Sequence, residues 1–129
     1  MFRWTALVTL GALALYFAML YRAGKARERT GLKAPATTGH PDFERAYRVQ
    51  MNTLEAMPLF LPPLWLAAFY VNDRFAALVG LVWIAGRFIY MQSYTADPAK
   101  RGAGFAIQGV AVCVLYASAL VGIVCTFLG

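Results

Sequence analysis

Long apolar stretches without charged side chains dominate the sequence. Residues 4–21, 56–71 and 102–129 contain no charged residue, and residues 75–96 contain only Arg87. These stretches are 16 to 28 residues long, and an α-helix needs roughly 20 residues to cross the hydrocarbon core of a bilayer. The sequence therefore predicts one integral membrane domain over residues 1–129. We expect an all-α four-helix bundle with helices at about 4–29, 41–71, 75–94 and 103–127.

The composition and the placement of charges agree with a multi-pass membrane protein. Hydrophobic residues make up 60% of the chain and charged residues only 14%, whereas soluble domains have about 45–50% and about 25%. The net charge of +6 comes from basic residues next to the apolar stretches, so we expect no nucleic-acid partner. Residues 22–48 contain seven Lys or Arg, and Lys100 and Arg101 lie in the last connection. The positive-inside rule places these two segments, and any chemistry near them, on the cytoplasmic side.

Three local features are explained by structure and do not indicate a function. The first apolar stretch is longer than the usual core of a signal peptide, about 7–15 residues, and basic residues follow it, so we expect a retained helix. Cys113 and Cys125 on one helix would lie about 18 Å apart, too far for a disulfide. With no His or carboxylate near them, we expect no metal site. His40, just before Pro41, is expected to cap a helix or to lie on the surface.

Two polar stripes interrupt the apolar helices, and each recurs at the spacing of one helical face. The first consists of Arg48, Asn52 and Glu55, and the second of Arg87, Tyr90 and Tyr94. One reading is a buried ion-pair network that fixes the helices. However, three arginines, counting Arg101, face a single glutamate, and surplus buried cations are costly unless an anion joins them. The imbalance favours a pocket for a small anionic ligand whose ammonium group meets Glu55, such as a zwitterionic peptide.

The same region resembles a known family. The run TTGHPDFERAYRVQMNTLEAMPLFL at residues 37–61, GRFIYMQSY at residues 86–94 and the Lys100–Arg101 pair resemble the MAPEG family, membrane-associated proteins in eicosanoid and glutathione metabolism. The likeness extends over nearly all of the chain from Ala26. It is greatest to the branch of microsomal glutathione transferases and leukotriene C4 synthase.

The resemblance implies a homotrimer that binds glutathione, its co-substrate, between neighbouring subunits. It implies a detoxifying transferase that joins glutathione to lipophilic electrophiles from the membrane, with peroxidase activity on lipid hydroperoxides as a side activity. Arg101 would be the catalytic residue, because a guanidinium favours the thiolate form of a thiol whose ordinary pKa is about 8.5. The implied glutathione-binding residues are Arg27, Arg48, Gln50, Asn52, Glu55, Arg87, Tyr90 and Tyr94.

The sequence departs from the family pattern at two positions, and two alternative functions stay open. Glu28 and Ala56 stand where the eicosanoid-conjugating member has an arginine and a tyrosine, which argues against that member's epoxide substrate. The first rival is a non-enzymatic protein of the same fold that binds lipid or glutathione, which would not need Arg101 at the sulfur. The second is a small multidrug-type exporter using Glu55, although the nearby arginines would repel cationic drugs.

Overall fold

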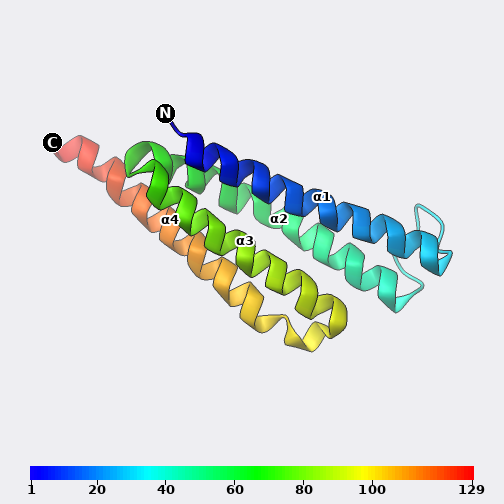
Figure 1. Ribbon diagram of the computed structural model, residues 1–129. Helices are drawn as coiled ribbons and strands as arrows, with labels where there is room; N and C mark the ends of the chain where they lie inside the picture. Colours follow the sequence, from blue (N-terminus) through cyan, green and yellow to red (C-terminus); the bar gives the residue numbers. More distant parts are fainter.

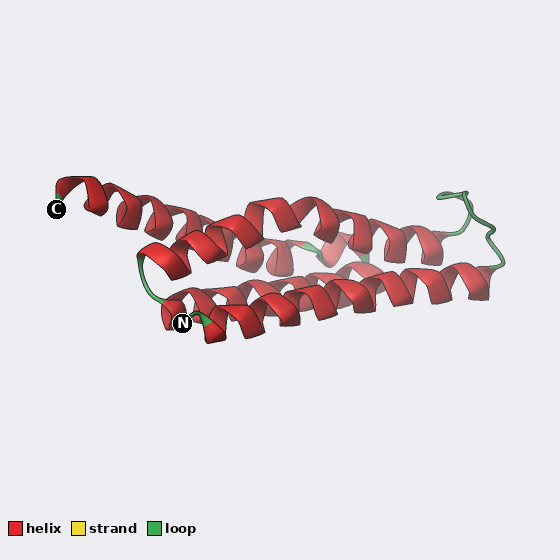
Figure 2. Ribbon diagram, turned by 90° about the horizontal axis from the view of Figure 1, so that it is seen from above, coloured by secondary structure: helices red, strands yellow, loops and turns green.

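Four α-helices form an elongated bundle. The computed structural model describes all 129 residues and contains no strand. Its elements are α1 (Arg3–Thr30), α2 (Pro41–Tyr70), α3 (Asp73–Ala96), the short 3₁₀ helix η1 (Pro98–Lys100) and α4 (Gly102–Leu128). Both termini lie at one end, and the 31–40 loop and the α3–α4 connection lie at the other, called here the loop end (Figures 1 and 2). The predicted all-α four-helix class is confirmed, and the largest differences in bounds, two residues, fall at the ends of α3.

Three of the four helical segments are long and apolar enough to cross a membrane. These are α1, α3 and the segment Pro98–Leu128, which contains η1 and α4. Helix α2 falls short of the expected fourth span. Its first half contains charged residues, and its uncharged part, residues 56–71, includes three prolines. It remains one continuous helix through Pro58, Pro62 and Pro63.

Polar side chains fix where the helices begin. The His40 ring accepts a hydrogen bond from the backbone N–H of Asp42 at 3.2 Å, so the expected capping role at the start of α2 is confirmed. At the opposite end, the Asp73 carboxylate accepts hydrogen bonds from the backbone N–H groups of Trp4 and Thr5, at 3.2 and 2.9 Å. Since the first N–H groups of a helix lack partners within it, Asp73 satisfies the start of α1 and joins α1 to α3.

The centre of the bundle is an aromatic and aliphatic core between α2, α3 and α4. The rings of Phe60 and Trp83 are stacked with centroids 3.9 Å apart. Leu64 and Leu115 are fully buried in the same cluster. Burial of aromatic rings of this size is a major source of packing energy. This core holds the three helices together beside the polar residues at the loop end.

Two glycines bring α3 and α4 into backbone contact. A Cβ atom on Gly86 would lie 2.7 Å from the backbone nitrogen of Gln108, and one on Gly104 would lie 2.7 Å from the carbonyl oxygen of Gly86. Real side chains do not tolerate such distances from backbone atoms. The absence of side chains here lets the start of α4 lie directly against the end of α3. That approach sets the distance between Tyr90 and Phe105, whose ring centroids are 6.2 Å apart.

We expect Gly104→Ala to lower the stability of the bundle by about 1–3 kcal/mol, because the added methyl group forces the α3 and α4 backbones apart. Gly109→Ala on the same helix is the control, since nothing lies within 4 Å of its Cβ position. The measurement is thermal unfolding of each variant in detergent. Equal midpoints for the two variants would contradict the close helix approach.

Candidate functional site

A polar cavity of about 410 Å³ opens at the loop end of the bundle. Helices α2, α3 and α4 contribute its walls together with the residue that precedes α4. The lining residues are Arg48, Asn52, Tyr90, Tyr94, Arg101 and Phe105. Five of the nine residues assigned to the site from the sequence therefore meet around one space. Phe105 was not predicted, because its apolar side chain does not stand out from its apolar neighbours in the sequence, although it lies one helical turn after Arg101.

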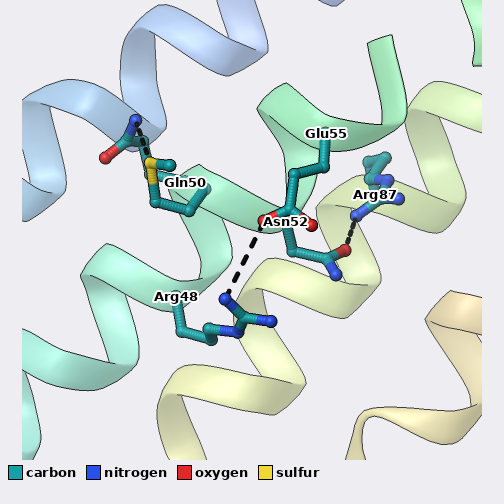
Figure 3. Close-up of polar contacts among 6 residues, drawn as sticks. Arg48, Gln50, Asn52, Glu55 and Arg87 are labelled. Atoms are coloured by element: carbon teal, nitrogen blue, oxygen red, sulfur yellow. Dashed lines mark hydrogen bonds and ion pairs between the residues drawn. The ribbon is translucent and has the colours of Figure 1, made fainter. Parts of the chain in front are cut away.

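The cavity has more positive than negative charge. Arg48 and Glu55 lie one above the other on α2, with Nη1 and Oε1 3.8 Å apart (Figure 3). Their side chains are 56% and 58% exposed, and an ion pair so open to solvent contributes little to stability. Arg101 is exposed and makes no ion pair. Glu55 does not itself line the cavity, and it reaches the site only through its ion pair with Arg48.

Arg87 lies behind the cavity wall rather than in it. The side chain is only 1% exposed, and its Nη1 donates a hydrogen bond to Oδ1 of Asn52 at 2.6 Å (Figure 3). Its guanidinium also lies over the rings of Trp83 and Tyr90, at 5.6 and 5.3 Å. Cation–π contacts and a charge-assisted hydrogen bond replace part of the hydration that burial removes. Arg87 therefore orients Asn52 and adds a third positive charge near the cavity.

The tyrosines form the α3 side of the cavity. Tyr90 and Tyr94 stack with ring centroids 5.5 Å apart, and Tyr90 also packs against Phe105. Neither hydroxyl makes a hydrogen bond within the chain. A phenolic hydroxyl both donates and accepts hydrogen bonds. Two such groups beside Arg48 and Arg101 suit a ligand that combines carboxylates with neutral polar groups.

Two residues predicted from the sequence lie away from the cavity. The amide of Gln50 donates to the hydroxyl of Tyr16 on α1 at 3.1 Å, so it points to the other side of α2 from Asn52 (Figure 3). Arg27 donates to the carbonyl oxygen of Ala36 at 2.8 Å and stacks over the ring of Phe43 at 4.3 Å. These two residues share the α1–α2 side of the bundle, whereas the cavity opens among α2, α3 and α4.

An apolar groove of about 560 Å³ runs along α2 and α4 beyond the polar cavity. Its α2 wall begins at Pro58, one helical turn after Glu55, and its α4 wall begins at Val112, two turns after Phe105. Proline and aliphatic side chains, with Cys113 and Tyr116, form most of the lining. A polar, cationic space and an apolar groove are thus arranged in sequence along the same two helices.

We expect Asn52→Ala to lower the free energy of unfolding by about 1.5–3 kcal/mol, because it leaves the buried guanidinium of Arg87 without its hydrogen-bond acceptor. Arg48→Ala removes an exposed side chain of the same cluster and should cost less than about 1 kcal/mol. Chemical unfolding of both variants in mixed micelles measures the difference. If the Asn52 variant is as stable as the Arg48 variant, the Arg87–Asn52 contact does not stabilise the bundle.

Comparisons with known proteins show the family of this chain. The model of the MAPEG family matches residues 5–121. An uncharacterized protein of Synechocystis sp. is 44% identical over 93% of this chain and 88% of its own length. Human microsomal glutathione S-transferase 2 is 40% identical over 88% of this chain and 76% of the relative. Leukotriene C4 synthase of Cavia porcellus is 37% identical over 95% of this chain and 82% of the relative. The chain is a member of the MAPEG family.

Proposed function

We propose that this protein is a membrane glutathione transferase that joins the glutathione thiolate to lipophilic electrophiles. The main support is the arrangement of a cationic cavity, with Glu55 paired to one of its arginines, directly before an apolar groove on the same helices. The similarity to relatives named microsomal glutathione S-transferase 2 and leukotriene C4 synthase supports the same class of reaction. An integral membrane position follows from three apolar helices and family membership, and we place the site on the cytoplasmic side.

Glutathione matches the charges of the cavity. The peptide has two carboxylates, one ammonium group and a thiol. In our proposal Arg48 and the amide of Asn52 bind the peptide's carbonyl and carboxylate oxygens, and Glu55 binds the γ-glutamyl ammonium. Tyr90 and Tyr94 supply hydroxyl groups that have no partner within the subunit. An anionic peptide with one cationic end would balance the surplus of arginines around a single glutamate.

Arg101 is assigned to the sulfur. A guanidinium cannot act as a base near neutral pH, so its role is to stabilise the thiolate while the proton leaves to water. A lowering of the thiol pKa by two units corresponds to about 2.7 kcal/mol of interaction that favours the anion. The exposed side chain of Arg101, at the rim of the cavity, is free to approach a bound sulfur atom.

The electrophile is assigned to the apolar groove between α2 and α4. A lipophilic compound dissolved in the membrane would reach this groove without leaving the hydrocarbon. With an aryl halide, the thiolate sulfur attacks the ring carbon, a carbon–sulfur bond forms, and the carbon–halogen bond breaks. The halide leaves with the bonding electron pair. The site then holds the two reactants next to each other, so that they need not meet by diffusion in solution. Such positioning accounts for a large part of the rate enhancement of many enzymes.

The assembly proposed is a homotrimer with one glutathione site at each interface. Arg27 and Gln50 point to the α1–α2 side of their own subunit. At a heterologous interface, that side of one subunit meets a different surface of the next. A neighbouring subunit's Arg27 and Gln50 would then complete the cavity formed by α2, α3 and α4, with Arg27 toward a carboxylate of the peptide.

We expect Arg101→Ala to lower glutathione conjugation to an aryl halide by about tenfold to hundredfold at pH 7, because the thiol regains its ordinary pKa. The rate of the variant should keep rising toward a pH of about 8.5, whereas the wild-type rate should level off at lower pH. Lys100→Ala removes the adjacent exposed cation and should keep the wild-type profile.

The same assay distinguishes the proposal from its alternative. Glu55→Gln should raise the KM for glutathione more than it lowers kcat. Glutathione binding without turnover across a panel of aryl halides, epoxides and lipid hydroperoxides would instead indicate a non-enzymatic binding protein. The lipid hydroperoxide in that panel also tests the peroxidase activity as a separate reaction.

Subunit mixing tests the shared site. Arg27→Ala and Arg101→Ala should each lower activity when expressed alone. Co-expression in equal amounts should restore about a quarter of the wild-type sites, because one interface in four then combines an intact Arg27 with an intact Arg101 from its neighbour. The measurement is activity per subunit of the co-purified mixture, at a glutathione concentration below KM. Activity no higher than the mean of the two separate variants would overturn an interfacial site.

A further inference from the structure

A second polar groove lies on the opposite side of the loop end from the candidate site. It has a volume of about 530 Å³, which is within the range of about 300–1,000 Å³ typical of small-ligand pockets. Helix α1, the start of α2 and the end of α3 form its walls. The lining residues are Tyr21, Arg22, Lys25, Ala26, Arg29, Asp42, Ala46, Gln92, Thr95 and Ala96. None of these residues belongs to the cavity assigned to glutathione.

The groove has three basic side chains and a single carboxylate, that of Asp42. Arg22 donates hydrogen bonds to Oε1 of Gln92 at 3.1 Å and Oγ1 of Thr95 at 3.5 Å. Both partners are neutral, so the charge of Arg22 is held in place without being compensated.

The other two basic side chains are also available to a ligand. Lys25 pairs at 3.5 Å with Glu28, and both side chains are more than half exposed, so this pair contributes little. Arg29 makes no ion pair. The groove therefore has a surplus of positive charge, and no carboxylate firmly neutralises it. Such a surplus attracts an anionic ligand.

The position of the groove corresponds to the edge of the membrane. Arg22 is the first charged residue after the uncharged stretch 4–21, and Gln92 and Thr95 lie near the end of the apolar stretch of α3. Exposed aromatic rings continue the two walls one helical turn deeper. Phe17 precedes Tyr21 by four residues and is 70% exposed, and Phe88 precedes Gln92 by four and is 48% exposed. Residues four apart share a helical face.

We propose that this groove binds an anionic phospholipid, with the headgroup phosphate among Arg22, Lys25 and Arg29. The acyl chains would lie against the exposed apolar faces of α1 and α3. Basic pockets between membrane helices are suited to anionic headgroups. The arrangement of cations at headgroup level above exposed aromatic rings matches an amphipathic ligand better than a free anion, which would gain nothing from the rings.

The test uses the full-length protein in neutral detergent micelles and follows its thermal unfolding midpoint. Phosphatidylglycerol should raise the midpoint in a saturable way. Phosphatidylcholine, which has no net charge, and inorganic phosphate, which has no acyl chains, should not. A shift of equal size with phosphatidylcholine would mean that any phospholipid stabilises the bundle, and a shift with inorganic phosphate would mean a free-anion site. Either result overturns the proposal.

Substitutions in the groove test whether the phospholipid binds there. Lys25→Gln and Arg29→Gln should each raise the half-saturating phosphatidylglycerol concentration about fivefold, the effect of removing one basic residue near an anionic headgroup. Lys33→Gln removes an exposed cation from the loop at the same end and should leave that concentration unchanged. Neither Lys25 nor Arg29 makes contact with another helix through a hydrogen bond, so folding should be preserved. Equal affinity for all three variants would overturn the assignment to this groove.

Discussion

The hydrogen bond from Arg87 to Asn52 is the interaction on which the polar end of the bundle depends. The Arg87 side chain is only 1% exposed. Removing a charged group from water costs several kcal/mol, so a buried guanidinium needs hydrogen-bond or cation–π partners. Asn52 on α2 and the faces of Trp83 and Tyr90 on α3 provide them. This requirement fixes how α2 and α3 lie relative to each other, and it turns Asn52 into a well-positioned member of the cavity wall.

The third wall of the cavity follows from a different constraint, which is close backbone contact. Gly86 and Gly104 let α4 start directly against α3. Arg101 immediately precedes α4, so the same contact brings its guanidinium to the rim beside Tyr90 and Tyr94. The buried Arg87 thus sets the distance between α2 and α3, and the two glycines set the distance between α3 and α4. The cavity is the space that remains between the three helices.

The charge pattern of the sequence predicted much of this arrangement. Arg48 and Asn52 share a face because they are four residues apart, and Tyr90 and Tyr94 share one for the same reason. The pattern did not predict that Arg87 would lie behind Asn52 instead of in the cavity, because spacing specifies a face and not a depth. Nor did it identify Phe105, whose apolar side chain is indistinguishable in the sequence from its lipid-facing neighbours.

By itself the sequence determined the helices, their approximate bounds, the polar end and the resemblance to a family, because hydrophobic length and helical period are local properties. Only the tertiary structure decided which polar residues share one space. Gln50, two residues from Asn52 along α2, is directed to Tyr16 on α1, whereas Arg101, far away along the chain, joins the cavity. Such choices depend on the distances and rotations between packed helices, which are set by burial of the whole bundle and not by any single segment.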